Sequence, residues 1–256
     1  MSGLRFAYLG SGSRGNGLLV ESAGTTVLVD CGFSIAETER RLLRLGREPG
    51  ELAAILVTHE HSDHIQGVAR FARRHHLPVW LTAGTRATGR CAEHPNLHAF
   101  SVHAPFAIED LQVQPFPVPH DAREPSQFVF SDGTVRLGLL TDAGCSTPHV
   151  EACLSGLDAL VLECNHDPAM LAASRYSPAL KRRVGGRFGH LSNRQSSELL
   201  SRVYCRRLQH LVAAHLSHEN NTPGLARDAL CGALGCTPQW IAVADQDAGL
   251  DWRAVS

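Results

Sequence analysis

The feature that most constrains this chain is a run of six residues rich in possible metal ligands, His59-Glu60-His61-Ser62-Asp63-His64. It follows a short apolar segment and precedes a helix expected over residues 65–75. Two residues apart on extended chain, His59 and His61 point to the same side, and Asp63 and His64 would begin the helix. Imidazole with carboxylate suits Zn, Mn or Fe. A polar loop with chance histidines is the alternative, and the length and mixed ligand types of the run argue against it.

Other possible ligands stand directly after short apolar segments that we expect to be buried strands. They are Asp30, His120, Asp142, Glu163 and His215. Buried strands that end at polar residues place these residues along one edge of the sheets. A site assembled there has its ligands on rigid strands and is open to solvent on one side. Two ions need more ligands than the run supplies, and His120, Asp142 and His215 are placed to provide them. Asp142 is the expected bridge, because a carboxylate offers one oxygen to each ion.

Length and composition favour one globular domain over residues 1–256, with strands and helices mixed and a last strand over residues 240–244. No apolar run reaches the length of a membrane span, and the first residues lack the pattern of a signal peptide. We therefore expect a cytoplasmic protein without a membrane partner. The eight cysteines form no C-x-x-C pair, which favours buried thiols. The formal net charge of −1 does not indicate a polyanion partner.

Residues 58–64 match the T-H-x-H-x-D-H signature of the metallo-β-lactamase superfamily, and the chain therefore resembles that family. The resemblance implies an α/β (α+β) fold, namely a four-layer αββα sandwich of two mixed β-sheets flanked by helices. It implies two divalent ions, Zn²⁺ or Mn²⁺ with Fe as a further option, bridged by Asp142. One ion would bind His59, His61 and His120, and the other Asp63, His64 and His215. Asp30 would orient ligands without binding a metal.

Four further stretches resemble the YycJ/WalJ-type exonuclease branch of that family and, more distantly, ribonuclease Z. They are residues 10–16, 163–167, 189–193 and 215–221. The resemblance implies catalytic roles for Glu163 and His190 beside Asp63, with His190 giving a proton to the leaving oxygen while Glu163 keeps it protonated. A loop histidine and a helix-capping carboxylate are the alternatives. No long arm for gripping tRNA is visible, which argues against tRNA processing.

Two groups of residues are candidates for contact with the substrate. Ser11, Ser13 and Asn16 could offer donors to phosphate, although a plain tight turn explains them equally well. A second group precedes His190 and could line an anionic groove, with a solvated helix face as the alternative; it comprises Lys181, Arg182, Arg183 and Arg187.

These features together predict a dinuclear-metal phosphodiesterase, specifically a DNA exonuclease that acts 5′ to 3′ through a hydroxide bridging the metals. The expected partner is a nucleic acid substrate, DNA, and no oligomeric state is predicted. The alternative is a small-molecule hydrolase that cleaves a cyclic phosphodiester, thioester or lactone on the same metals. A regulatory protein that binds the metals without turnover is the third interpretation.

Overall fold

The computed structural model describes residues 3–92, 94–203 and 205–256. In this part of the chain two seven-stranded sheets pack face to face. The first contains β1 (Leu4–Gly10), β2 (Gly17–Ser22), β3 (Thr25–Val29), β4 (Leu52–Leu56), β5 (Val79–Thr82), β6 (Leu97–Phe100) and β14 (Leu250–Val255). The second contains β7 (Phe106–Ile108), β8 (Leu111–Pro117), β9 (Ser126–Ser131), β10 (Arg136–Leu140), β11 (Ala159–Glu163), β12 (His210–Ala214) and β13 (Ala242–Val243).

Both sheets mix parallel and antiparallel pairs. The first runs in the order β14-β1-β2-β3-β4-β5-β6 and is antiparallel as far as β3, then parallel. The second runs in the order β13-β12-β11-β10-β9-β8-β7 and is parallel from β13 to β10, then antiparallel. Parallel strands end at the same edge of a sheet, so each sheet delivers several strand ends to one place.

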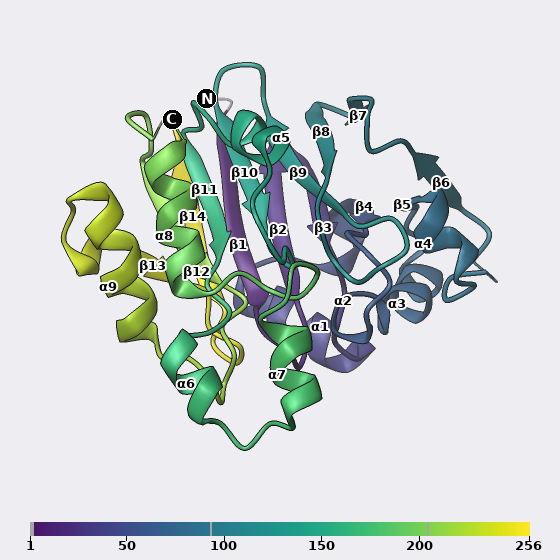
Figure 1. Ribbon diagram of the computed structural model, residues 1–256. Coiled ribbons are helices and arrows are strands. Elements are labelled where there is room, and N and C mark those ends of the chain that lie inside the picture. Colours follow the sequence, from purple (N-terminus) through teal and green to yellow (C-terminus); the bar gives the residue numbers. More distant parts are fainter. Residues whose placement is uncertain (1–2, 93, 204) are drawn as a thin grey trace.

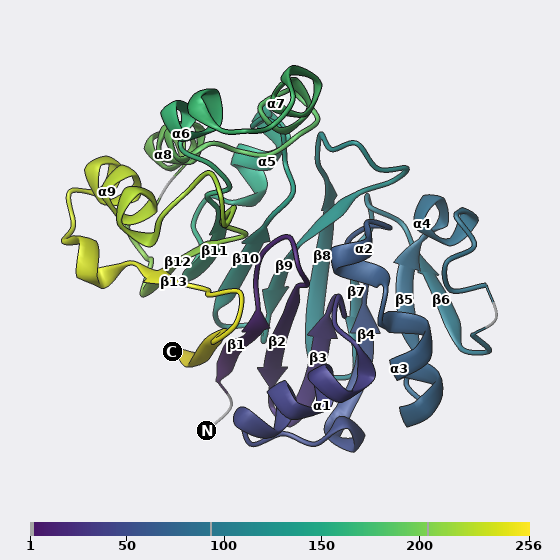
Figure 2. The same cartoon turned by 90° about the horizontal axis from the view of Figure 1, so that it is seen from below.

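Helices cover the outer faces of both sheets (Figures 1 and 2). On the side of the first sheet lie α1 (Ile35–Arg44), α2 (Ser62–Ile65), α3 (Val68–His75) and α4 (Ala83–Ala87). On the side of the second lie α5 (Pro148–Cys153), α6 (Pro168–Ala173), α7 (Pro178–Val184), α8 (Asn193–Arg202) and α9 (Pro223–Leu234). Two short 3₁₀ helices, Pro49–Glu51 and Pro238–Trp240, complete the set of described helices. The predicted αββα sandwich is confirmed.

Four helices on the second sheet begin with the same local signal. In α5, α6, α7 and α9 the first residue is proline, preceded by Thr147, Asp167, Ser177 and Thr222 respectively. Each of these side chains accepts a hydrogen bond from a backbone N–H of the first turn, while proline lacks the N–H that would need a partner there. The sequence therefore specifies where these helices start.

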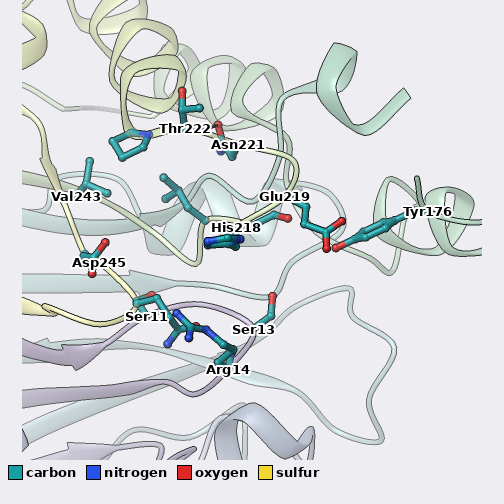
Figure 3. A pocket seen from close by; sticks show the side chains of 15 residues that line it. Ser11, Ser13, Arg14, Tyr176, His218, Glu219, Asn221, Thr222, Val243 and Asp245 are labelled. Atoms are coloured by element: carbon teal, nitrogen blue, oxygen red, sulfur yellow. Dashed lines mark hydrogen bonds between the residues drawn. The ribbon is translucent and has the colours of Figure 1, made fainter. Parts of the chain in front are cut away.

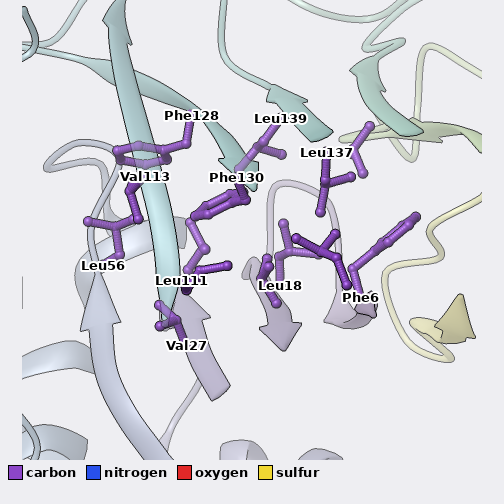
Figure 4. Packing of buried hydrophobic residues seen from close by; sticks show 14 of the residues in the cluster. Phe6, Leu18, Val27, Leu56, Leu111, Val113, Phe128, Phe130, Leu137 and Leu139 are labelled. Atoms are coloured by element: carbon purple, nitrogen blue, oxygen red, sulfur yellow. The ribbon is translucent and has the colours of Figure 1, made fainter. Parts of the chain in front are cut away.

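The main core lies between the sheets and takes apolar side chains from both (Figure 4). Phe6, Leu18 and Val27 come from the first sheet and face Phe128 and Phe130 from the second. Two further clusters bury the outer faces of the sheets under their helices. This common core supports the prediction of one domain over residues 1–256, which stays a prediction.

Replacing Phe130 by alanine is expected to lower the free energy of unfolding by about 3–5 kcal/mol, because the side chain is fully buried and its loss leaves a cavity. Urea denaturation followed by circular dichroism measures this change. The matched control is Leu43→Ala, since the Leu43 side chain is 71% exposed and should change stability by less than about 0.5 kcal/mol. Equal effects of the two substitutions would contradict this assignment of the core.

Two expected elements differ from the structure. The helix expected over residues 65–75 begins only at Val68, because the Gly67 amide donates to the Cys31 carbonyl oxygen at 2.9 Å instead of to that of Asp63, which accepts from the Asn16 amide. The last strand expected over residues 240–244 is only the two-residue β13, and the chain continues to β14, which pairs antiparallel with β1.

All eight cysteines are free thiols, of which Cys31, Cys91, Cys153 and Cys164 are buried. The other four are half-buried, so the expectation of buried thiols is right for only part of the set. Within the described residues, no helix combines the length and apolar composition that a membrane crossing requires.

Candidate active site

The structure brings the seven predicted ligands together at one edge of the two sheets, near α2 and α7 (Figure 1). His59 follows β4 of the first sheet, and α2 carries Asp63 and His64. His120, Asp142 and His215 follow β8, β10 and β12 of the second sheet. Both sheets therefore contribute ligands.

Three residues of the site have left-handed backbone conformations that non-glycine residues rarely adopt. The φ angles are 61° at Asp30, 52° at Asp142 and 56° at His215. Such conformations cost about 1–3 kcal/mol each and persist only where the surroundings hold them. The Asp30 amide donates to the Leu56 carbonyl oxygen at 2.8 Å, and the His215 amide donates to the Ser11 hydroxyl at 2.9 Å. These bonds hold the sharp turns that aim the side chains into the site.

One group of possible ligand atoms comes from His59, His61 and His120. His120 donates from Nδ1 to the Gly189 carbonyl oxygen at 3.0 Å, which leaves its Nε2 facing His61 Nδ1 at 3.2 Å. The Thr58 hydroxyl donates to Asp30 and so accepts from His59 Nδ1 at 3.0 Å. In both rings Nδ1 is occupied by a hydrogen bond, which leaves Nε2 as the possible metal ligand.

A second group comes from Asp63, His64 and His215. His64 donates from Nδ1 to Asp30 Oδ2 at 2.7 Å, and its Nε2 faces Asp63 Oδ2 at 3.4 Å. His215 donates from Nδ1 to Glu163 Oε1 at 3.2 Å, and its Nε2 also lies 3.4 Å from Asp63 Oδ2. Carboxylates therefore orient both rings from behind.

Asp142 lies between the two groups and is almost completely buried. It shares ligand-like clusters with His59 and His64 on one side and with His190 and His215 on the other. Its Oδ2 and the Nε2 of His59 are buried without a hydrogen-bond partner among the described residues. Unpaired buried polar atoms are costly, so these two atoms fit a bound cation.

The electrostatics at His59 and Asp142 agree with that fit. Burial and the neighbouring His64 hold the pKa of His59 well below its usual value, which keeps a lone pair available. Burial opposes ionisation of Asp142, yet His215 and His64 hold the pKa of Asp142 well below its usual range. Burial acts to lower the pKa values of His64 and His215, but the surrounding carboxylates, Asp142 first, outweigh it and raise the pKa of His64 well above its usual value and that of His215 to about 10. A divalent ion that binds here would therefore displace a proton from each of these two rings.

Asp30 lies behind the ligands. Its Oδ1 accepts from the Thr58 amide at 2.8 Å, and its Oδ2 accepts from the Thr58 hydroxyl at 2.8 Å and from His64 Nδ1.

Replacing Asp30 by asparagine should lower metal affinity by about 10- to 100-fold, because the His64 ring loses its orienting carboxylate. Competition with a chromogenic chelator measures this change. The exposed Asp110→Asn variant is the control, and equal affinities of the two variants would remove this role from Asp30.

Glu163 joins the ligand cluster to His190. Its fully buried carboxylate accepts from His190 Nδ1 at 2.8 Å and from His215 Nδ1 through Oε1, and from the amides of Ala143 and Leu191 through Oε2. Burial acts to lower the pKa of His190, but the Glu163 carboxylate outweighs it and raises that pKa above its usual value. Burial likewise opposes ionisation of Glu163, whose pKa His190 nevertheless lowers to about 2. The Glu163 carboxylate therefore favours the protonated form of His190, whose Nδ1 also lies 3.4 Å from Asp142 Oδ1.

A cavity of about 330 Å³ opens over the cluster and is lined by Ser13, Asp63, Asp142, His190 and His215, among others. Of the other two residues predicted to contact phosphate, Ser11 supports the His215 turn. Asn16 lies beneath the cluster, with its amide nitrogen 3.2 Å from His64 Nε2 and 3.3 Å from the Asp63 carbonyl oxygen. Both therefore shape the site from behind.

Among the predicted basic residues, Arg183 lines this cavity, whereas Lys181, Arg182 and Arg187 do not. Arg183 donates to Asp121 at 2.6 Å, and the Lys181 ammonium donates to the Ala172 carbonyl oxygen at 2.6 Å. Two lining residues were missed in the sequence, Arg90 and Asp121. Arg90 follows α4 and carries no motif, while Asp121 is next to His120 and could have been noticed for that reason.

Comparison with known proteins agrees with this geometry. The family model described as "Beta-lactamase superfamily domain" matches residues 25–215. The chain is 36% identical to "Exodeoxyribonuclease YycJ" of Bacillus anthracis, over 91% of this chain and 89% of that protein. It is 31% identical to "Exodeoxyribonuclease WalJ" of Streptococcus pneumoniae serotype 2 (strain D39), over 98% and 93%. The likeness to "Ribonuclease Z" of Bradyrhizobium diazoefficiens is 49% over only 20% of this chain and 16% of that protein.

Among solved structures, the metallo-β-lactamase fold protein YhfI of Bacillus subtilis superposes with a TM-score of 0.78 at 15% identity and covers 99% of this chain and 100% of that one. At that identity the likeness shows the fold alone. The family match and the relatives show a metal-dependent hydrolase of ester bonds, with the candidate ligands gathered where the fold implies divalent metals. The chain therefore belongs to the β-lactamase superfamily of the metallo-β-lactamase fold, in the branch that contains YycJ and WalJ.

Proposed function

We propose that this chain is a dinuclear-metal phosphodiesterase that removes nucleotides from DNA ends in the 5′-to-3′ direction. The observation that carries the proposal is the pair formed by Glu163 and His190 beside Asp142, because it supplies a proton donor that a phosphodiester leaving group needs. The relatives named as exodeoxyribonucleases support DNA as the substrate. We propose the cytoplasm as the place where the enzyme acts.

In this proposal His59, His61 and His120 hold one ion and Asp63, His64 and His215 the other, with Asp142 between them. Two divalent ions, when bound, activate the attacking water and offset the charge of the phosphodiester. Asp63 lines the cavity, so its carboxylate would be placed to accept a hydrogen bond from the attacking water. The metal identity is proposed to be Zn²⁺ or Mn²⁺.

His190 gives its proton from Nε2, because its Nδ1 donates to Glu163. Glu163 is held by two backbone amides, so it keeps the ring in one orientation while the proton leaves. Arg183 and Arg90 both line the cavity, and their guanidinium groups would contact the non-bridging phosphate oxygens.

A small-molecule hydrolase is the second candidate, and the cavity favours it. A volume of about 330 Å³ is within the range of small-ligand pockets, so a cyclic nucleotide could occupy the same place. A thioester would have less need of His190, because a thiolate is a weaker base than an alkoxide and leaves without being protonated.

The test is hydrolysis by purified protein, stripped of metal and reloaded with Zn²⁺ or Mn²⁺. The substrates are double- and single-stranded DNA and RNA labelled at either end, a cyclic nucleotide and a thioester, with His61→Ala as the inactive control. We expect metal-dependent release of mononucleotides from DNA, beginning at the 5′ end. Cleavage of only the cyclic nucleotide or the thioester would overturn the nuclease proposal, and first release from the 3′ end would reverse the proposed direction.

A further inference from the structure

A second and larger cavity, of about 520 Å³, opens beside the ligand cluster (Figure 3). Its walls are the turn between β1 and β2, the loop between β12 and α9 and the turn between β13 and β14, with Tyr176 entering from the loop between α6 and α7. Ser13 lines both this cavity and the one over the cluster. The two cavities are therefore neighbours that meet at a single residue. We call the larger one the side pocket.

The walls of the side pocket are held in place by hydrogen bonds. Gln246 accepts from the Arg14 amide at 2.8 Å and donates to the Gly15 carbonyl oxygen at 2.9 Å. On the opposite wall, Asn221 donates to the Cys164 carbonyl oxygen at 2.6 Å, and the Ser217 hydroxyl accepts from the Asn220 amide at 3.2 Å. A pocket built before its ligand arrives loses little conformational freedom on binding.

Several groups in the side pocket are free to meet a ligand. Among the residues that the structure describes, the His218 ring, the Tyr176 hydroxyl and the Glu219 carboxylate have no hydrogen bond or ion pair. Figure 3 shows Tyr176 pointing toward Glu219, with His218 beside them. Arg14 pairs with Asp247, but the side chains are 62% and 69% exposed, and an ion pair so exposed contributes little. Arg14 can exchange Asp247 for another anion.

We propose that the side pocket binds the nucleotide next to the scissile phosphodiester of a DNA strand, an inference that rests on the proposed nuclease function. The rings of His218 and Tyr176 offer surfaces on which a base stacks. Glu219 accepts from an exocyclic amine of the base, and Arg14 contacts a backbone phosphate. A volume of about 520 Å³ is within the range that a nucleotide-sized ligand needs. A strand that passes Ser13 reaches both cavities at once.

The test is the affinity of metal-loaded protein for a single-stranded trinucleotide with phosphorothioate linkages, which resist hydrolysis, followed by fluorescence anisotropy. Removing one stacking ring weakens binding by about tenfold, so His218→Ala and Tyr176→Ala should each raise Kd by that factor. In the nuclease assay KM for single-stranded DNA should rise in parallel, while kcat changes by less than about threefold. His103→Ala is the matched control, because His103 is exposed in the loop between β6 and β7.

His218→Phe and Tyr176→Phe separate stacking from structural damage, since both keep a ring and should bind within about threefold of the wild type. An unchanged Kd in the double alanine variant, or no binding of the trinucleotide by the wild type, would overturn the side pocket as a nucleotide site. Equal weakening in the phenylalanine and alanine variants would do the same. Ring-dependent trinucleotide binding without cleavage of any DNA would retain the site and reject the proposed nuclease activity.

Discussion

Replacing Asp142 by asparagine should lower kcat/KM for DNA by at least about 10³-fold and reduce the metal content of the purified protein. Asp142 is the carboxylate within reach of both ligand groups, with Oδ2 3.2 Å from His64 Nε2 of one group and Oδ1 3.8 Å from His120 Nε2 of the other. Asparagine keeps the shape but removes the negative charge between the ions, a loss of several kcal/mol in the transition state, and each 1.4 kcal/mol is tenfold in rate. Steady-state kinetics and elemental analysis on the same sample measure both effects.

The exposed Asp110→Asn variant is the control for the chemical change and should retain full activity. The melting temperature of Asp142→Asn distinguishes a lost ligand from a lost fold. A folded Asp142→Asn protein with two metals per chain and activity within tenfold of the wild type would contradict the bridging role.

Replacing His190 by alanine should lower kcat for DNA by about 10²- to 10⁴-fold, the range for loss of a positioned proton donor. A nitrophenyl phosphodiester should lose far less, because nitrophenolate leaves without being protonated. The comparison of the two substrates therefore isolates proton donation from binding or folding. His103→Ala controls for loss of a histidine. An equal loss on both substrates would show that His190 does not act as the acid for the leaving group.

Much of the site could be predicted because its residues are local in sequence. The run from His59 to His64 lies between β4 and α3, and the remaining ligands stand directly after strands whose apolar residues mark them as buried. The ends of parallel strands lie at the same edge of a sheet, so polar residues that directly follow apolar segments in the sequence are expected to cluster in the structure. The pattern of segments predicts strands and helices mixed in one domain, whereas the layered sandwich was expected from the resemblance of residues 58–64 to the family signature.

The features that were missed depend on contacts between distant segments. The pairing of Glu163 with His190 was expected from the family resemblance, but its contacts with His215 and with two backbone amides far from it in sequence were not, since no local pattern shows them. The strand β14 is buried only at its two ends, Leu250 and Val255, and includes charged residues, so its sequence shows no strand alternation and pairing with β1 decides its conformation. Arg90 lines the cavity from the loop after α4, and no motif in that loop marks it. By contrast, α6 could have been predicted from Asp167 followed by proline.

The most direct test of the account is a metal titration in which bound metal and hydrolysis are measured in the same sample. Protein stripped with a chelator is given Zn²⁺ or Mn²⁺ in steps, and each step is assayed for bound ions per chain and for cleavage of a phosphodiester. The account predicts saturation at two ions per chain, with activity rising mainly as the second ion binds. Full activity at one ion per chain, or two bound ions without cleavage of any ester, would contradict a dinuclear hydrolytic centre.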